Sequence, residues 1–289
     1  MDDRKNPQVI VIASGKGGTG KSTLSINISM ALAELGRRVA ILDANLELPS
    51  IATLLNISPP YTITDLLEGR SSIREVIYNG PHGINLILGS SLPKSMRNLS
   101  PAHHFGIVNA FNALAKELDI LIIDTAPGIN NSTLNFIRAS QDILLVTTNE
   151  PTAIASTNAL INTLHSAYGL HNFKLLFNMT NNMHEGKKAF NTLQKLNNNN
   201  IGIFLTYAGH VHEHKSARIA ASKGRILYEM FPKSDFTQDM KKLAQHIESW
   251  PLRETPSGNI EFFMDELING SSRSMQGNEK HLLNTYITK

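Results

Sequence analysis

One segment constrains the fold more than any other: residues 14–22, Ser-Gly-Lys-Gly-Gly-Thr-Gly-Lys-Ser, follow an apolar run and open a helical pattern. The run at 8–13 indicates a buried strand, and residues 21–35 have the spacing of an amphipathic helix. The loop between them fits G-x-x-x-x-G-K-[ST], a pattern whose glycines let backbone N–H groups approach phosphate oxygens. The following helix N-terminus also favours an anion. This order of strand, loop and helix predicts an α/β fold that holds a phosphate-bearing ligand.

The rest of the chain repeats the alternation of apolar runs and helical patterns. Further strands are expected at 38–43, 84–88, 119–124, 142–147, 173–178 and 201–205, and further helices at 102–117, 130–139, 151–167 and 184–196. Several runs are nearly continuous Ile, Leu and Val, which is typical of strands covered on both faces. We therefore predict a mostly parallel β-sheet flanked by helices on both faces. Ligand-binding residues are expected beyond the carboxyl ends of its strands.

Length and composition set broad limits on the kind of protein. The 289 residues are expected to form one domain over 1–268, which ends in an amphipathic helix at 259–268, and a flexible polar tail at 269–289. The polar face of that helix is acidic, which favours core packing over docking to membrane or to a partner. The net charge of +3 gives little support for nucleic-acid binding, and the absence of cysteine excludes thiolate-bound metal or iron–sulfur sites. A polar N-terminus without a signal-peptide core favours a cytoplasmic location.

Candidate site residues follow the strands. Lys21 is expected to reach the β- and γ-phosphates, and the Ser22 hydroxyl to bind Mg²⁺. Asp124 ends an apolar strand, where a carboxylate partners the metal through water; the alternative is a cap on the next helix. Asp43 closes the second strand and is placed to hold a water on Mg²⁺. Asn45 lies on the same side of the extended chain, and its amide can hold a water but cannot take its proton.

Three further features add to these candidates. Gly128 can bring a backbone N–H towards the γ-phosphate. Lys16, directly after the first glycine, is a second lysine that an ordinary phosphate loop does not need. Alternate histidines at 210, 212 and 214 share a face of an extended chain, so zinc binding is conceivable. Their neighbours, a glycine at 209 and a lysine at 215, favour instead an exposed loop near the nucleotide.

The loop K-G-G-x-G-K-[ST] at Lys16 to Ser22 resembles that of the MinD/ParA class of deviant Walker ATPases, the SIMIBI class of P-loop NTPases. Within that class the chain resembles most the FleN/FlhG regulators of flagellar number. This second likeness extends over about residues 8–268 and includes the segments 37–39, 61–69, 150–154, 207–211, 249–252 and 258–267.

The resemblance implies an ATPase that uses ATP and Mg²⁺ and forms a face-to-face homodimer, in which Lys16 of one subunit reaches the phosphates of the other. It implies catalytic roles for Lys16, Asp43, Asn45 and Asp124, and an adenine contact for Asn178. The implied nucleotide-binding loop consists of Gly15, Lys16, Gly17, Gly18, Thr19, Gly20, Lys21, Ser22 and Thr23. Implied partners are a FleQ-like transcription activator and an FlhF-like GTPase. The resemblance allows peripheral contact with the inner face of the cell membrane or the cell pole as the alternative to core packing, and it implies no direct sequence-specific nucleic-acid binding.

The sequence departs from the family pattern near the expected site. Where the family has Asp-x-Asp at the end of the second strand, this chain has Asp43-Ala44-Asn45, and the following segment is Glu-Leu-Pro-Ser in place of Gly-Leu-x-Asn. We therefore predict ATP binding with slow hydrolysis. The alternatives are a nucleotide-gated binding module without significant ATPase activity, and a ParA-type partition ATPase, which needs a strong basic patch.

Overall fold

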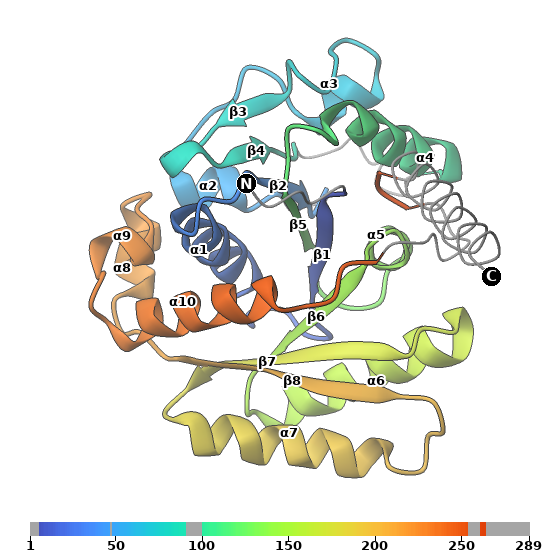
Figure 1. Cartoon of the computed structure of the whole chain (residues 1–289), viewed down its shortest axis with the longest axis vertical. Helices are drawn as coiled ribbons and strands as arrows, with labels where there is room; N and C mark the ends of the chain where they lie inside the picture. The colour runs from blue at the N-terminus through green and yellow to red at the C-terminus, as the bar shows by residue number, and fades with distance from the viewer. Residues whose placement is uncertain (1–5, 47, 91–99, 254–260, 264–289) are drawn as a thin grey trace, which may run out of the picture.

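The computed structural model describes residues 6–46, 48–90, 100–253 and 261–263. Within these residues an eight-stranded sheet forms the centre of the molecule, in the order β3-β4-β2-β5-β1-β6-β7-β8 (Figure 1). Neighbouring strands run parallel except for the β3–β4 pair. The strands are β1 (Gln8–Ala13), β2 (Val39–Ala44), β3 (Ile77–Asn79), β4 (Asn85–Ile87), β5 (Ile120–Thr125), β6 (Asp142–Thr147), β7 (Asn172–Thr180) and β8 (Phe204–His212).

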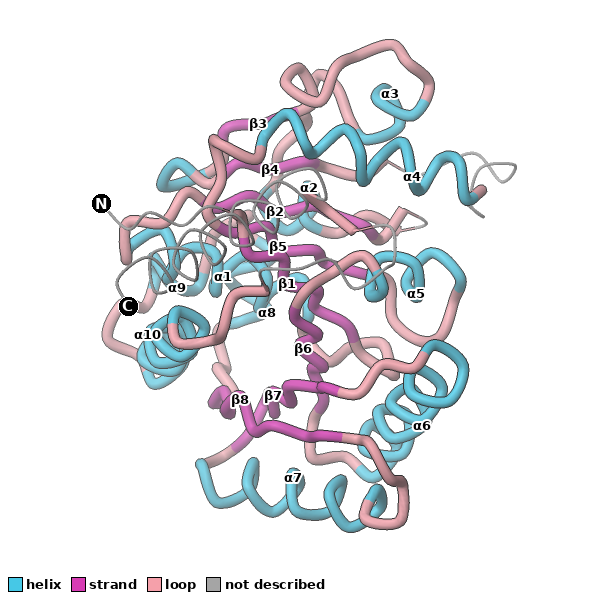
Figure 2. The backbone as a smooth tube through the Cα atoms, turned by 45° about the vertical axis from the view of Figure 1, so that its right-hand side comes forward, coloured by secondary structure: helices cyan, strands magenta, loops and turns pink. Residues whose placement is uncertain are grey.

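Helices cover both faces of this sheet (Figure 2). The described α-helices are α1 (Lys21–Glu34), α2 (Ile51–Leu55), α3 (Ile63–Leu67), α4 (Pro101–Ala110), α5 (Asn131–Arg138), α6 (Pro151–Tyr168), α7 (Met183–Asn197), α8 (Ala217–Ser222), α9 (Leu227–Met230) and α10 (Asp235–Glu248). Helices α1, α2 and α8 to α10 pack on one face, and α3 to α7 on the other. In the part of the chain that is described, no helix combines the length and hydropathy that a bilayer-spanning segment requires.

The alternation of side chains along β1 explains why its sequence is continuously apolar. Val9 and Val11 belong to the core beneath α4 to α6, whereas Ile10 and Ile12 belong to the core beneath α1 and α10, and all four are fully buried. A strand covered by helices on both sides has no side chains that face solvent. Its sequence therefore lacks the alternation of polar and apolar residues that a half-exposed strand shows. The predicted parallel sheet with two covered faces is thus confirmed.

Two predicted elements differ in the structure, and one strand was missed. The strand expected at 201–205 is β8, which begins at Phe204 and continues to His212. Ile201 is 95% exposed and Gly202 has a φ of 93°, so these residues form the turn before the strand. The helix expected at 102–117 ends at Ala110 and continues as a short 3₁₀ segment (Phe111–Leu114). The antiparallel edge strand β3 was not predicted, because its three residues are too short for a clear pattern.

Three described residues near the C-terminus pack into the core. Phe262 and Phe263 are fully buried, and the Phe262 ring meets the Phe111 ring edge-on at 5.1 Å between centroids. Phe263 has a φ of 58°, so the chain turns here. The rest of the amphipathic helix predicted at 259–268, the domain end at 268 and the tail predicted at 269–289 lie outside the described residues. At the described positions, these apolar side chains have the core-packing role.

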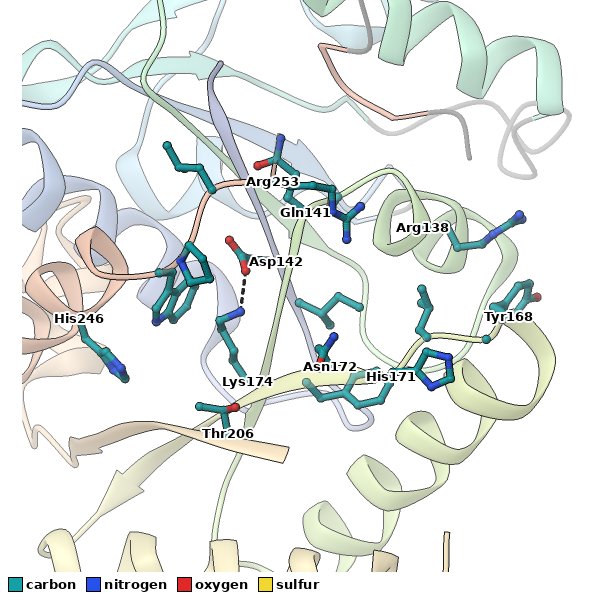
Figure 3. A pocket seen from close by; sticks show the side chains of 18 residues that line it. Arg138, Gln141, Asp142, Tyr168, His171, Asn172, Lys174, Thr206, His246 and Arg253 are labelled. Carbon is teal, nitrogen blue, oxygen red and sulfur yellow. Dashed lines mark hydrogen bonds and ion pairs between the residues drawn. The ribbon is translucent and has the colours of Figure 1, made fainter. Parts of the chain in front are cut away.

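A cavity of about 770 Å³ lies where β6 and β7 begin, opposite the carboxyl ends of the strands. Figure 3 shows Asp142 and Lys174 pointing towards each other in this cavity, with Nζ 2.6 Å from Oδ1. Lys174 Nζ also lies 4.6 Å from the centre of the Trp250 ring, and Gln8 Nε2 donates to Asp142 Oδ2 at 2.8 Å. None of the site residues predicted from the sequence lines this cavity. The ion pair therefore holds the scaffold together away from the site.

We expect Lys174→Met to lower the free energy of unfolding by on the order of 3 kcal/mol, because it leaves the Asp142 carboxylate buried without its cation. The two side chains are only 17% and 8% exposed, so solvent screens the pair weakly. Urea denaturation at neutral pH measures the change. The control is Arg74→Ala, which breaks an exposed ion pair with Glu117 and is expected to cost about 0–1 kcal/mol. Equal losses in the two variants would contradict the prediction.

Candidate nucleotide-binding site

The loop between β1 and α1 needs glycine for two different reasons. Gly18 and Gly20 have φ values of 80° and 85°, in the left-handed region that side chains disfavour. Gly15 is restricted by space instead, because a Cβ there would lie 2.2 Å from the Ser156 carbonyl oxygen of α6. Gly17 is less crowded, with Pro127 Cγ 3.8 Å from the corresponding point. The loop is therefore held against α6 while its backbone curls around the start of α1.

Lys21 begins α1 and is almost completely buried. Burial lowers the pKa of its ammonium group, and the nearby Asp124 carboxylate partly offsets this effect. Its Nζ donates a hydrogen bond to Ser14 Oγ at 2.8 Å, while the Gly128 N–H donates to the Ser14 carbonyl oxygen at 2.8 Å. The loop after β5 is thus joined to the phosphate-loop segment. The sequence-predicted residues Lys21 and Gly128 meet at the same serine.

Two buried carboxylates face each other at the ends of neighbouring strands. Asp43 on β2 and Asp124 on β5 are register partners and have no exposed surface. Burial raises the pKa of Asp43 to about 7, and the Asp124 charge adds to the effect. Burial also raises the pKa of Asp124 to about 6, although hydrogen bonds from Ser22 and Ser25 and the charge of Lys21 oppose it. Two negative charges are therefore costly here unless a cation joins them.

The oxygen atoms at this place suit a hard cation. Ser22 Oγ donates to Asp124 Oδ2 at 2.5 Å, and Ser50 Oγ lies 2.7 Å from Ser22 Oγ. Hydroxyl and carboxylate oxygens are the protein ligands that Mg²⁺ prefers, and its charge would relieve the carboxylates. The predicted metal residues Ser22, Asp43 and Asp124 are brought together, so the residues present fit Mg²⁺.

Asn45 follows β2 in a local turn. Its backbone N–H donates to Asp43 Oδ1 at 3.2 Å, and its side-chain Oδ1 accepts from the Leu48 N–H at 3.4 Å. Asp43 Oδ2 accepts from the N–H groups of Ser50 and Ile51, so this carboxylate also orders the start of α2. Ser50, which stands where the family pattern has Asn, thus contacts both Asp43 and Ser22 on one side of the site.

A cavity of about 440 Å³ lies on the other side of the loop. It is lined by Gly20, Thr23, Leu24, Asn178, Met179, His212, Glu213, His214, Lys215, Ala217, Arg218, Leu227 and Phe236. Asn178 Nδ2 donates to the Thr19 carbonyl oxygen at 2.8 Å, so this amide also supports the loop. The buried Thr19 hydroxyl has no hydrogen-bond partner among the described residues, which leaves it available to a ligand. A base beside Asn178 and phosphates in the loop would fit this arrangement.

Lys16 points back onto its own subunit. Its Nζ contacts Glu150 Oε2 at 2.5 Å and donates to Thr152 Oγ1 at 3.0 Å, at the start of α6. The Lys16 and Glu150 side chains are 39% and 61% exposed, so the ion pair lies at the surface and is weak. Lys16 is therefore the one predicted loop lysine that lies away from the buried carboxylates.

Several contacts of the site were not predicted. Ser14, Ser25 and Ser50 bond to site residues, and Glu150 and Thr152 hold Lys16. Ser25 could have been inferred, because it follows Lys21 by one helical turn and must share its face. Ser14 lies in the same loop as Lys21, but the loop pattern does not specify its contact. The remaining contacts join segments far apart in sequence, and single-sequence patterns carry no signal for them.

Comparisons with known proteins agree with this geometry. A family model described as "ParA: NUBPL iron-transfer P-loop NTPase" matches residues 5–248. The chain is 41% identical over 261 residues to the antiactivator FleN of Pseudomonas aeruginosa, which covers 90% of this chain and 93% of FleN. It is 28% identical over 273 residues to the flagellum site-determining protein YlxH of Helicobacter pylori, which covers 93% of this chain and 92% of YlxH.

Solved structures share the fold. The cell-division ATPase MinD of Pyrococcus furiosus matches with a TM-score of 0.68 and 23% identity, over 83% of this chain and 98% of MinD. The septum site-determining protein MinD of Pyrococcus horikoshii, complexed with Mg-ADP, also matches with a TM-score of 0.68, at 22% identity over 84% of this chain and 96% of that one. The solved structures agree in fold, and the family model over residues 5–248 and the 41% identity to FleN show that the chain belongs to the ParA/MinD family of P-loop NTPases.

Proposed function

We propose that this chain is an ATP-dependent, dimerising regulator of flagellar number or placement and of flagellar gene expression. The observation that carries the proposal is the 41% identity to FleN over 90% of the chain. The likeness to YlxH, a flagellum site-determining protein, supports the same function. The structures of ParA-type proteins share only the fold, at 16% to 19% identity. The net charge of +3 also gives little support for a partition ATPase, which needs a strong basic patch to bind DNA.

The loop from Gly15 to Thr23 binds the ATP phosphates in this proposal, with backbone N–H groups and Lys21 as donors. The Gly128 N–H, which donates to the Ser14 carbonyl oxygen in this structure, turns to the γ-phosphate only when that hydrogen bond is released, and Asn178 lies beside the adenine. Ser22, Asp43 and Asp124 hold Mg²⁺, directly or through water. Mg²⁺ when bound neutralises charge on the phosphates and orders them for attack. Asp43 and Asp124 lie at two adjacent strand ends, which fixes their separation before ligand arrives.

Lys16 is the proposed link between nucleotide and dimer. It is exposed and held by a weak surface ion pair, so its release from Glu150 costs little. In the proposed dimer its ammonium group leaves Glu150 for the phosphates of the partner subunit. A second cation beside a triphosphate stabilises both the assembled state and the charge that develops during phosphoryl transfer.

Light scattering after size exclusion, with and without Mg²⁺ and ATP, tests the dimer. The wild type is expected to elute as a dimer with ATP and as a monomer without it, and Lys16→Ala as a monomer in both. Lys195→Ala, at an exposed position of α7, is the control and is expected to dimerise. A wild type that stays monomeric with saturating ATP would refute the mechanism.

Further elements of the proposal concern partners and location. In its ATP state the dimer binds and restrains a FleQ-like transcription activator, and acts with an FlhF-like GTPase at the cell pole. The protein is cytoplasmic and touches the inner face of the membrane peripherally. FleN is described as an antiactivator, which supports a transcription activator as the target of this chain. Co-elution of the activator with the ATP dimer, lost for Lys16→Ala, is the expected result.

A second candidate function is a nucleotide-gated binding module with negligible hydrolysis. Asn45 favours it, because an amide at this position cannot accept a proton. Both candidates share the ATP-dependent dimer and differ in turnover, so a steady-state ATPase assay separates them.

A further inference from the structure

Two histidines of β8 lie side by side at the surface. His210 and His212 are separated by one residue, Val211, which is fully buried. Alternate residues of a strand project to the same side, and the two imidazole rings are 5.1 Å apart between centroids. Both side chains are half-buried, so they are ordered by their surroundings and still reachable from solvent. A pair of imidazoles in this arrangement can share one ligand.

A buried carboxylate from another element completes the cluster. Asp239 of α10 is only 4% exposed, and its Oδ2 accepts a hydrogen bond from the His212 backbone N–H at 2.9 Å. The same oxygen lies 2.6 Å from His212 Nδ1. One ligand atom of each of the three residues lies within 4.8 Å of the others. Asp239 is therefore placed to bind an ion shared with the imidazoles.

His214, the third alternate histidine, lies apart from this cluster. Its ring packs against Phe231, with centroids 4.7 Å apart, and against Phe236 at 6.3 Å. The strand ends at His212, so the alternation that the sequence suggests does not continue. Asp239, 27 positions beyond His212, takes the third place, which no local pattern indicates.

The donor set identifies the class of ion. Two imidazoles and one carboxylate are the ligands of zinc-class transition metals, whereas Mg²⁺ prefers oxygen atoms alone. The cluster shares no residue with the proposed magnesium site of Ser22, Asp43 and Asp124. The site resembles a zinc site with three protein ligands, which leaves a further coordination position for water or ligand.

The cluster adjoins the proposed nucleotide cavity. His212 lines that cavity together with Asn178 and Gly20, while His210 is not among its lining residues. An ion that fixes the His212 ring would fix one wall of the cavity. We propose that His210, His212 and Asp239 form a site for a zinc-class divalent ion whose occupancy changes the affinity of the neighbouring cavity for nucleotide. The metal site stands on its own geometry, and the linkage rests on the proposed function.

Metal binding is tested first, without nucleotide. The full chain, free of any histidine tag and stripped with chelator, is titrated with Zn²⁺ against a chromophoric competitor, in millimolar Mg²⁺. One Zn²⁺ per chain is expected, with affinity about 10- to 100-fold lower in His210→Ala and His212→Ala. His184→Ala, at an exposed position of α7, is the matched control and is expected to bind as the wild type does. Equal Zn²⁺ affinity in His210→Ala and wild type would overturn the site.

Co²⁺ provides a readout that general surface binding would not give. Coordination by His210, His212 and Asp239 is expected to produce the intense visible absorption of four-coordinate Co²⁺, which is lost in His210→Ala. Asp239→Asn is also expected to lose it, and circular dichroism checks that this buried substitution still folds. A weak octahedral spectrum in the wild type would contradict the proposal.

The linkage is measured with a fluorescent ATP analogue in constant excess Mg²⁺. Zn²⁺ is expected to change its dissociation constant at least threefold in the wild type and to leave that of His210→Ala unchanged. Because His210 does not line the cavity, its variant retains the nucleotide site. Unchanged nucleotide affinity in a wild type that binds Zn²⁺ overturns the linkage. Failure of the analogue to bind at all refutes the proposed function, whereas the titration and the Co²⁺ spectrum still judge the metal site.

Discussion

Asn45→Asp is expected to raise steady-state ATP hydrolysis by on the order of 10²–10³-fold. In the wild type the Asn45 amide oxygen accepts a long hydrogen bond from the Leu48 N–H, and its backbone N–H supports Asp43. An amide at this place can orient a water but cannot accept its proton. A carboxylate there can do both, while the backbone contact to Asp43 remains.

Phosphate release with excess Mg²⁺ and ATP, at protein concentrations that give dimer, measures the effect. Asn45→Ala is the matched control and is expected to stay within a few-fold of the wild type, because it adds no base. The dissociation constant for ATP is expected to change little in either variant. Equal turnover of wild type and Asn45→Asp would show that hydrolysis is not limited by this position.

Features written in short stretches of sequence were predictable. The loop 14–22 specifies its own conformation, because glycine adopts the positive φ found at Gly18 and Gly20 without the steric strain that a side chain would cause. The apolar runs specify strands with two covered faces, and Asp43 and Asp124 meet because they end two of these strands. Their places at the strand ends were enough to predict that the two carboxylates lie near the phosphate loop.

Features that depend on packing between distant segments were not predictable. The space against α6 that requires Gly15 to lack a side chain exists only once α6 is placed. β8 continues to His212 because it pairs with β7 along this length, with an irregularity in the register near Gly209. In the sequence, that glycine favoured a loop rather than a strand. Asp239 joins the histidines for the same reason, since α10 is set by its packing on α1 and β8 rather than by any local motif.

The second large effect is expected for Asp124→Asn, which should stabilise the nucleotide-free protein while removing activity. Burial raises the pKa of Asp124 to about 6, despite the hydrogen bonds from Ser22 and Ser25 and the charge of Lys21. The carboxyl group therefore stabilises the folded state below its unfolded pKa near 4, and this stability is lost as pH rises through about 6. Asparagine does not ionise, so the variant does not lose this stability as pH rises. Its amide can still accept a hydrogen bond from one of the two serines and donate one to the other.

At pH 8, without Mg²⁺ or nucleotide, we expect Asp124→Asn to raise the free energy of unfolding by on the order of 1–3 kcal/mol, and at pH 5 by less. Urea denaturation at both pH values measures the difference. Asp119→Asn is the control of opposite sign. Burial raises the pKa of Asp119, but hydrogen bonds from Arg38 outweigh this effect and lower the pKa overall, so the variant is expected to lose stability.

Hydrolysis by Asp124→Asn is expected to fall on the order of 10²-fold or more, since a neutral amide holds Mg²⁺ poorly. A variant less stable than the wild type at pH 8 would mean that the buried carboxylate pair is already neutralised within the protein, and that Mg²⁺ is not needed to join it.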